Sequence, residues 1–319
     1  MVKDLLVKIK VKKQNIDFNN PLNKPKIKKT SGTGFFISNN YILTCYHVIE
    51  NSIEIYLNHQ KTNKEKIKAK VHSIFPDDDL AVLYVDNEKY GINVGKVDTL
   101  ILKNNIKDDE NVLVYGYPLN SNTIKFSKGS LSGFHKSYFE TDATLNPGNS
   151  GGPLVYNNKI IGINVSKLAS DKVDNVGYSV PIKRFLVYEK MTNLRSSIIF
   201  EKPNLGFTFQ FIDKNQFSKF NIPLDYGIRI VSFIDKIGDI EKGDFLLEFD
   251  NKKIDIYGDL EIESFPEKVN IKEITKWYNI GKKVNLKYYS IKTKDVKEIE
   301  ILLENKKLFD NYYKNYSED

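Results

Sequence analysis

The sequence predicts a mainly β protein, with a larger all-β barrel or sandwich followed by a smaller α+β domain. Between Thr33 and about Tyr188, short apolar runs such as "GTGFFIS", "LAVLYVD" and "NVLVYGYP" alternate with Gly, Asn, Asp and Pro, which is typical of many short strands. From about Glu201, further strand-like runs surround one segment of helical period, "VNIKEITKWYNIG". A length of 319 residues is enough for two domains with separate cores.

Particular turn and helix signals support this division. The dipeptide at 157–158, "NN", lies between two apolar runs and predicts a hairpin turn. After Pro181 the apolar residues follow a helical period to Glu189, so we expect a helix to close the first domain. A second helix is expected over 271–280, because its apolar residues share one face and Gly281 suits the position just past its end.

Both ends of the chain are expected to lie outside the two domains. At the N-terminus, Val7, Ile9 and Val11 alternate with lysines, which predicts a basic extended arm or edge strand within residues 1–29. These lysines interrupt what would be the apolar core of a signal peptide, so no secretion signal is expected. The polar tail over 306–319 is expected to be loosely attached.

The composition is that of a weakly basic globular protein. The formal net charge is +7, but nearly all of the cations are lysines, whereas nucleic-acid binding favours clustered arginines with interleaved aromatic residues. We therefore expect no nucleic-acid partner, and no membrane partner either, since no apolar run reaches the length of a membrane span. Cys45 is the only cysteine; we interpret it as a buried packing thiol in a reducing, cytoplasmic compartment, with a nuclear location as the alternative.

A serine surrounded by glycines, in "NPGNSGGPLV", is the candidate nucleophile. Such a loop is either a flexible connector or a tight support for Ser150, and the choice depends on whether the chain also supplies a base and an acid. His47 follows the apolar run "YILTC", and imidazole is the side chain whose pKa suits a general base. Asp79 directly precedes "LAVL" and could fix the tautomer of that imidazole.

Five motifs in order resemble the signatures of the HtrA/Deg family of serine proteases: "SGTGFFIS…YILTCYHV", "DDDLAVL", "YGYPL", "TDATLNPGNSGGPLV…KIIGIN" and "VGYSVP". The resemblance covers about residues 30–305. It implies a chymotrypsin/trypsin-like double β-barrel over 30–190 and a smaller α+β, PDZ-like domain over 201–305. It further implies a catalytic triad, with His47 and Asp79 from the first barrel and Ser150 from the second.

The same resemblance implies the remaining parts of a protease site. The backbone N–H groups of Gly148 and Ser150, with Asn149 between them, are expected to form an oxyanion hole. Thr144 lies six residues before the nucleophile, which corresponds to the base of the primary specificity pocket. Its small, neutral side chain implies a preference for small or medium aliphatic residues before the cut.

The PDZ-like domain has a predicted peptide site. Leu205, Gly206 and Phe207 would form the loop whose N–H groups capture a C-terminal carboxylate, and the strand through Phe211 would pair with the peptide beside the helix over 271–280. An equal alternative is that this domain only packs on the protease or mediates assembly.

The other titratable candidates are interpreted as structural. His59 lies in a hydrophilic segment and is expected on the surface, and Asp77 and Asp78 are expected to be solvated turn residues. His72 and His135 lack the spacing of metal ligands, so neither a metal nor another cofactor is expected.

The predicted function is that of an ATP-independent serine endopeptidase that hydrolyses unfolded or misfolded proteins. The alternative is a catalytically silent, chaperone-like peptide-binding module on the same scaffold, which the filled triad positions disfavour. Because proteins of the HtrA type are commonly trimers or multiples of trimers, a homo-oligomer is expected.

Overall fold

The computed structural model describes residues 2–15, 22, 24–60, 62, 67–91, 110–135, 138–165, 176–186, 202–213, 217–218, 222–262 and 268–305. The chain divides into two compact units, residues 1–200 and 201–319. The predicted tail over 306–319 lies outside the described residues. Among the described helices, none has the length and apolar character needed to cross a membrane.

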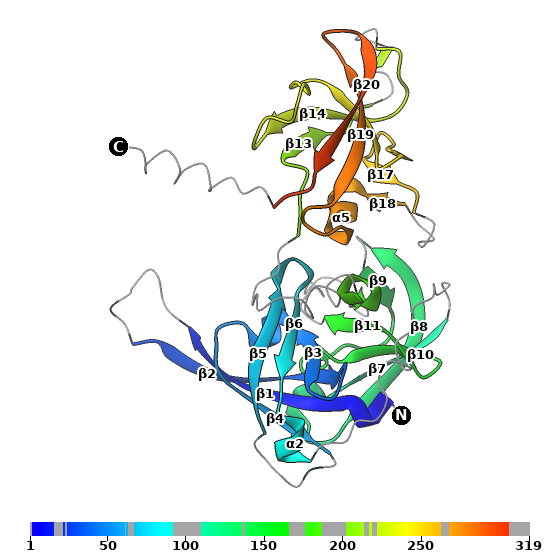
Figure 1. Cartoon of the computed structure of the whole chain (residues 1–319). Helices are drawn as coiled ribbons and strands as arrows, with labels where there is room; N and C mark the ends of the chain where they lie inside the picture. The colour runs from blue at the N-terminus through cyan, green and yellow to red at the C-terminus, as the bar shows by residue number, and fades with distance from the viewer. Residues whose placement is uncertain are drawn as a thin grey trace. The chain divides into compact units, whose positions relative to one another are not determined.

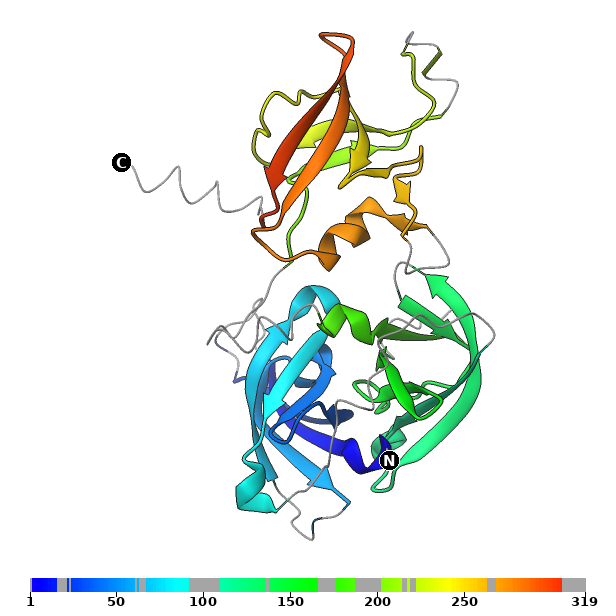
Figure 2. The ribbon, with the colours of Figure 1, turned by 45° about the vertical axis from the view of Figure 1, so that its right-hand side comes forward.

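The first unit is a pair of closed six-stranded barrels, which confirms the predicted double barrel (Figure 1). The first barrel, blue to cyan in Figure 2, closes in the order β1-β2-β3-β6-β5-β4, and the second, green, closes in the order β10-β11-β12-β9-β8-β7. The strands of the first are β1 (Leu6–Asn15), β2 (Lys26–Phe36), β3 (Tyr41–Cys45), β4 (Ser52–His59), β5 (Ile67–Phe75) and β6 (Leu80–Tyr84). Those of the second are β7 (Asn111–Gly116), β8 (Lys125–His135), β9 (Tyr138–Thr141), β10 (Pro153–Tyr156), β11 (Lys159–Val165) and β12 (Gly177–Pro181).

Short helical turns connect the strands of this unit: η1 (Val2–Leu5), α1 (Tyr46–Ile49), η2 (Pro76–Asp78), α2 (Asn87–Tyr90) and η4 (Pro118–Asn120). The predicted hairpin turn is present between β10 and β11, where Asn157 and Asn158 have φ of 44° and 58°, as a tight two-residue turn requires. The helix predicted after Pro181 is helical over 182–186, and its remainder lies outside the described residues.

The N-terminal strand β1 is part of the first barrel, so for these residues the prediction of a basic arm outside the domain is wrong. β1 pairs along its whole length with β2 and, on its other side, with β4. Val7, Ile9 and Val11 point into the core and are at most 2% exposed. Alternation of lysine with apolar residues marks any strand that has one buried face, and it cannot distinguish an edge strand from one that closes a barrel.

His59 is buried, contrary to the expectation that it lies on the surface. It ends β4, on the face where Ile55 and Leu57 also point inward, and it is 4% exposed. Its Nε2–H donates to the backbone oxygen of Asp4 at 2.8 Å, and its ring meets that of Phe36 edge-on. The hydrophilic residues after His59 suggested exposure, but the period of two along β4 determines which way its side chain points.

The second unit is built on one antiparallel sheet in the order β13-β14-β15-β19-β20, with β16 paired to β15 and a separate pair, β17 and β18. These strands are β13 (Phe207–Gln210), β14 (Ile228–Phe233), β15 (Phe245–Phe249), β16 (Lys252–Lys253), β17 (Asp259–Leu260), β18 (Val269–Asn270), β19 (Lys283–Ser290) and β20 (Asp295–Leu302). The helical part comprises α5 (Ile271–Ile274) and η6 (Thr275–Trp277). This composition confirms an α+β unit.

The helix predicted over 271–280 is shorter than expected, because it ends at Trp277. Tyr278 has extended backbone, and its hydroxyl donates to Asp250 at 2.8 Å while its ring packs edge-on against Phe249. These tertiary contacts end the helix before the apolar pattern does. Gly281 has φ of +86°, so it occupies a left-handed turn, but not at the helix end.

The placement of β1 predicts a large difference between two neighbouring substitutions. Ile9→Ala should lower the free energy of unfolding by about 2–5 kcal/mol, because it leaves a cavity in the barrel core. Lys10→Ala, at an exposed position on the opposite face, should change it by less than about 0.5 kcal/mol. Urea unfolding followed by circular dichroism measures both values. Equal stabilities for the two variants would contradict a buried β1.

Candidate active site

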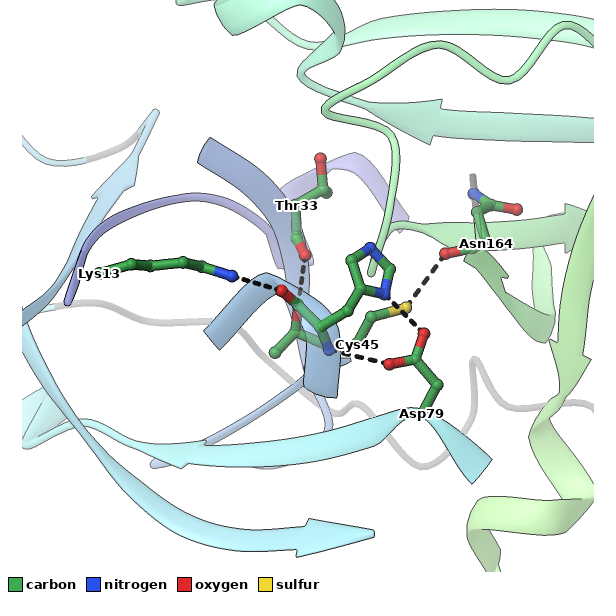
Figure 3. Close-up of polar contacts among 7 residues, drawn as sticks. Lys13, Thr33, Cys45, Asp79 and Asn164 are labelled. Carbon is green, nitrogen blue, oxygen red and sulfur yellow. Dashed lines mark hydrogen bonds and ion pairs between the residues drawn. The ribbon is translucent and has the colours of Figure 1, made fainter. Parts of the chain in front are cut away.

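The pairing of β3 with β6 brings His47 and Asp79 together. Cys45 lies opposite Leu80 in the antiparallel register, so the residues just beyond this pair are neighbours. The N–H of Tyr46 donates to the backbone oxygen of Asp79, and the N–H of His47 donates to Asp79 Oδ1, both at 2.8 Å. His47 Nδ1 lies 2.6 Å from Asp79 Oδ2 (Figure 3). An ionised carboxylate only accepts, so Nδ1 is the donor in this contact, and in the neutral imidazole the lone pair is then on Nε2.

The turn that carries Asp79 is anchored by a buried ion pair. Asp79 has φ of +54° and ψ of 37°, a left-handed conformation that is uncommon outside glycine and persists only where neighbours hold it. The preceding Asp78 is fully buried and pairs with Arg184, from the helical segment after β12, whose guanidinium carbon is 5.2 Å from the ring centroid of Tyr138. The expectation of a solvated Asp78 is therefore wrong, whereas Asp77 is exposed. On one tight helical turn, consecutive aspartates point in different directions.

The loop that carries Ser150 is fixed to the first barrel. Ser150 is 4% exposed, and its backbone oxygen accepts from the N–H of Thr33 at 2.9 Å. Gly151 has φ of +82°, and a Cβ there would lie 2.2 Å from both the Thr33 oxygen and Thr44 Oγ1, so only glycine fits. The N–H of Gly151 donates to the oxygen of Asn164 on β11. This loop of the second barrel therefore lies against the strands that lead to His47.

Two hydrogen bonds orient the backbone around Gly148. The Thr33 hydroxyl donates to the Gly148 oxygen at 2.7 Å, and the N–H of Leu119 donates to the Pro147 oxygen, also at 2.7 Å. Because a trans peptide points its C=O and N–H in opposite directions, the Gly148 N–H is directed away from Leu119. Gly148 itself has φ of +102°, which favours glycine.

The amide of Asn149 is already engaged within the loop. Its N–H donates to the oxygen of Asn146, and its carbonyl accepts from the N–H of Gly152, each at 2.9 Å. Of the three residues predicted for the oxyanion hole, Asn149 therefore has its N–H committed elsewhere. Gly148 and Ser150 remain the predicted donors.

The thiol of Cys45 is buried beside the His47–Asp79 pair. It is fully inaccessible, as expected, and donates to the oxygen of Asn164 at 3.3 Å (Figure 3). Burial, and secondarily the charge of Asp79, raises the pKa of this thiol well above its usual value. The thiol therefore stays neutral and serves as a packing group.

Cys45, His47 and Asp79 are also, among the residues that the structure describes, the one set of three potential metal ligands within 4.8 Å of one another. Their spacing does not suit zinc. The 2.6 Å between His47 Nδ1 and Asp79 Oδ2 is shorter than the roughly 3.3 Å between two tetrahedral ligands at Zn–N and Zn–O distances of about 2.0–2.1 Å. We therefore interpret the set as a hydrogen-bonded acid–base pair beside a neutral thiol.

Other predicted residues lie elsewhere. Thr144 is exposed and its backbone oxygen accepts from the Ser127 hydroxyl at 2.7 Å; its assignment to a specificity pocket remains a prediction. His72 is half-buried, with Nδ1 2.7 Å from the Ser73 hydroxyl, and burial lowers its pKa. The side chain of His135 lies outside the described residues.

Sequence reasoning missed three supporting residues. Lys13 Nζ donates to the backbone oxygen of His47 at 2.6 Å (Figure 3), Arg184 anchors the turn before Asp79, and Thr33 holds the loop of Ser150. Of these, only Arg184 carried a signal, as one of the few arginines in a lysine-rich chain. The other two act through contacts between segments far apart in the sequence.

Two closed barrels, with a His–Asp pair on one and a glycine-bounded serine on the other, define the fold of a chymotrypsin-like serine protease. A family model for a trypsin-like peptidase domain matches residues 32–163. The chain is 31% identical over 250 residues to putative protease Do-like 3, mitochondrial, of Arabidopsis thaliana, covering 71% of this chain and 42% of that protein. It belongs to the HtrA/Deg family.

One more relative is similar in sequence, and two solved structures are similar in fold. Protease Do-like 4, mitochondrial, of Arabidopsis thaliana is 34% identical over 177 residues, or 50% of this chain and 32% of that protein. The HtrA-type protease AlgW with decapeptide superposes with a TM-score of 0.69 at 18% identity, covering 95% of this chain and 96% of that one. A serine endoprotease from Yersinia pestis gives 0.62 at 22% identity, covering 95% and 94%.

The chain spans only part of its curated relatives, between 32% and 42% of the two Arabidopsis proteins. The names of the relatives include mitochondrial, chloroplastic and periplasmic forms. These comparisons give no support to the predicted cytoplasmic location.

The buried ion pair predicts that two adjacent aspartates differ sharply. Asp78→Ala should lower the free energy of unfolding by about 3–5 kcal/mol, because Arg184 is left buried without its carboxylate. Asp77→Ala, at an exposed position, should change it by no more than about 0.5 kcal/mol. Chemical denaturation measures both, and in the double variant Asp78→Ala/Arg184→Leu the losses should be less than additive. A mild Asp78→Ala would show that the pair does not anchor the turn.

Proposed function

We propose that this chain is a serine endopeptidase that hydrolyses unfolded or misfolded proteins without ATP. The observation that carries the proposal is the two-point contact between Asp79 and His47, through Oδ1 to the backbone and Oδ2 to Nδ1. Such a contact fixes both the tautomer and the orientation of an imidazole, as a general base for a hydroxyl nucleophile requires. Family membership supports the same reaction.

In the proposed mechanism, the lone pair on His47 Nε2 accepts the proton of Ser150 Oγ as that oxygen attacks the scissile carbonyl carbon. Asp79 stabilises the imidazolium that results. The N–H groups of Gly148 and Ser150 stabilise the oxyanion of the tetrahedral intermediate, each worth about 3–4 kcal/mol in the transition state. His47 then donates the proton to the leaving amine, and water releases the acyl group by the same steps.

For the second unit we propose peptide binding along β13. Among the described strands β13 lies at the end of the sheet, so an extended peptide could add to it. The segment Leu205, Gly206 and Phe207 leads into it, with φ of +71° at Gly206. β13 ends at Gln210, so Phe211, expected within the strand, lies just beyond it and is 53% exposed.

Solved structures of AlgW that contain a decapeptide or a tripeptide support a peptide ligand as the partner. Assembly into trimers or multiples of trimers is proposed on the family resemblance alone. If the second unit mediates assembly instead, its removal should change the oligomeric state and leave peptide affinity unaltered.

The triad assignment predicts the effects of three substitutions. Ser150→Ala and His47→Ala should each abolish nearly all cleavage of unfolded casein, and Asp79→Ala should be severe, because the three groups act as a unit. Gel analysis of casein digestion and thermal unfolding of each variant are the measurements. Asp77→Ala is the control and should retain activity. Full digestion by Ser150→Ala would refute the assignment, and an inactive wild-type chain that still binds casein would favour the silent, chaperone-like alternative.

The specificity assignment predicts which residues precede the cut. Thr144 offers no charge to a substrate side chain, so cleavage should follow small or medium aliphatic residues such as Val, Ala or Ile. Mass-spectrometric mapping of casein fragments tests this. The matched variant Thr144→Asp should shift cleavage toward Lys and Arg, through a new charge pair. Predominant cleavage after Lys or Arg by the wild-type chain would contradict the prediction.

A further inference from the structure

Lys8 is a buried cation far along the chain from the proposed triad. Its side chain lies on the face of β1 opposite to the core residues Val7 and Ile9, yet it is only 1% exposed. Burial, and secondarily the charge of Lys10, lowers the pKa of its ammonium group. A buried ammonium needs close oxygen acceptors, so its contacts show which part of the structure it holds.

The Lys8 ammonium donates to the turn over 117–122, which consists of η4 and the residues that flank it. Nζ lies 2.7 Å from the backbone oxygen of Asn120 and 3.1 Å from Asn122 Oδ1. In this turn Leu119 and Asn120 have φ of 50° and 61°, left-handed values that are uncommon outside glycine. Backbone of this kind persists where its surroundings hold it, and Lys8 supplies two such bonds.

The same turn sets the direction of the Gly148 amide. The N–H of Leu119 donates to the Pro147 oxygen at 2.7 Å, which fixes the plane of the Pro147–Gly148 peptide. A Cβ on Gly148 would lie 2.5 Å from the oxygen of Tyr117, so the turn and the loop are in close contact. A change in the conformation of the turn would therefore alter the direction of the Gly148 N–H, the proposed oxyanion donor.

Thr33 lies opposite Lys8 in the register of β1 and β2 and holds the same two segments. Its hydroxyl accepts from the N–H of Tyr117 at 2.9 Å and donates to the oxygen of Gly148 at 2.7 Å. The cross-strand pair of Lys8 and Thr33 thus joins the first barrel to both the turn and the loop.

We propose that Lys8 is a positioning residue for the oxyanion hole: by holding the turn at Asn120, it keeps the Gly148 N–H directed at the reacting carbonyl oxygen. This inference rests on the proposed peptidase function. It assigns to the N-terminal strand a role in transition-state stabilisation and none in substrate binding. The contacts of the Lys8 ammonium are with Asn120 and Asn122, so it acts on the oxyanion donor through the turn.

The test compares Lys8→Met, which removes the ammonium but keeps the apolar stem, with Lys8→Arg and the exposed control Lys10→Met. Steady-state kinetics on a peptide taken from a mapped casein cleavage site give kcat and KM, and a peptide boronate of the same sequence reports affinity for a tetrahedral adduct. Because loss of one oxyanion donor costs about 100- to 1,000-fold, its misdirection in Lys8→Met should lower kcat at least about 10-fold. The boronate affinity should fall in parallel, with KM within about 3-fold.

Lys8→Arg should lie closer to wild type than Lys8→Met does, and Lys10→Met should match wild type. Should Lys8→Met fail to fold, Asn122→Leu, at an exposed position, removes one acceptor and should lower kcat by about 3-fold or more without raising KM. If folded Lys8→Met, or Asn122→Leu, keeps the wild-type kcat and boronate affinity, the inference about Lys8 is overturned and the proposed peptidase function stands. A wild-type chain that neither cleaves the peptide nor binds the boronate would overturn the proposed function and this inference with it.

Discussion

Thr33 is the residue on which the joining of the two barrels depends. It is fully buried, and each of its polar groups is engaged: its N–H with Ser150, its hydroxyl with Gly148 and Tyr117, and its carbonyl with the Thr44 hydroxyl. A buried polar group that is fully paired specifies a unique arrangement, since any shift would leave several groups unpaired at once. Thr33 thus holds the serine loop against the strands that lead to His47, through both its hydroxyl and its main-chain groups.

The acid–base pair depends on a second long-range contact. The left-handed backbone at Asp79 costs on the order of 1 kcal/mol or more, and the Asp78–Arg184 ion pair holds the turn in which it occurs. Arg184 comes after the last strand of the second barrel, so the acid of the first barrel is positioned partly by the second. The two barrels are therefore coupled at the serine loop and again at the aspartate turn.

Much of this architecture could be predicted from the sequence, because local patterns determine strands and tight turns. The apolar run of β6, the hairpin at Asn157, and the glycines around Ser150 each have a local physical cause. The contacts that position the site could not be predicted in this way. Three of these contacts link residues that are distant in sequence: Lys13 with His47, Lys8 with Asn120, and Asp78 with Arg184. Nothing in the local sequence distinguishes their charged side chains from solvated ones.

The error at the N-terminus has the same origin. A lysine on every second position of β1 suggested solvent on that face, but at Lys8 the turn from the second barrel covers the strand. Burial of a lysine is rare enough that sequence reasoning correctly disfavours it, and here two oxygen acceptors compensate for the lost hydration. His59 illustrates the opposite case, where period two within the strand outweighs the polar character of the residues after it.

The closure of the first barrel by β1 has a consequence for the order in which a growing chain becomes competent. β1 is made before both of its neighbours, and the second of them, β4, emerges only after β2 and β3 have been made. Ser150 and Asn164 come much later, and Arg184, the anchor of the aspartate turn, comes later still. Nascent chains therefore carry a base and an acid long before these are locked in register, and the reacting centre is completed only when synthesis of the double barrel is essentially finished.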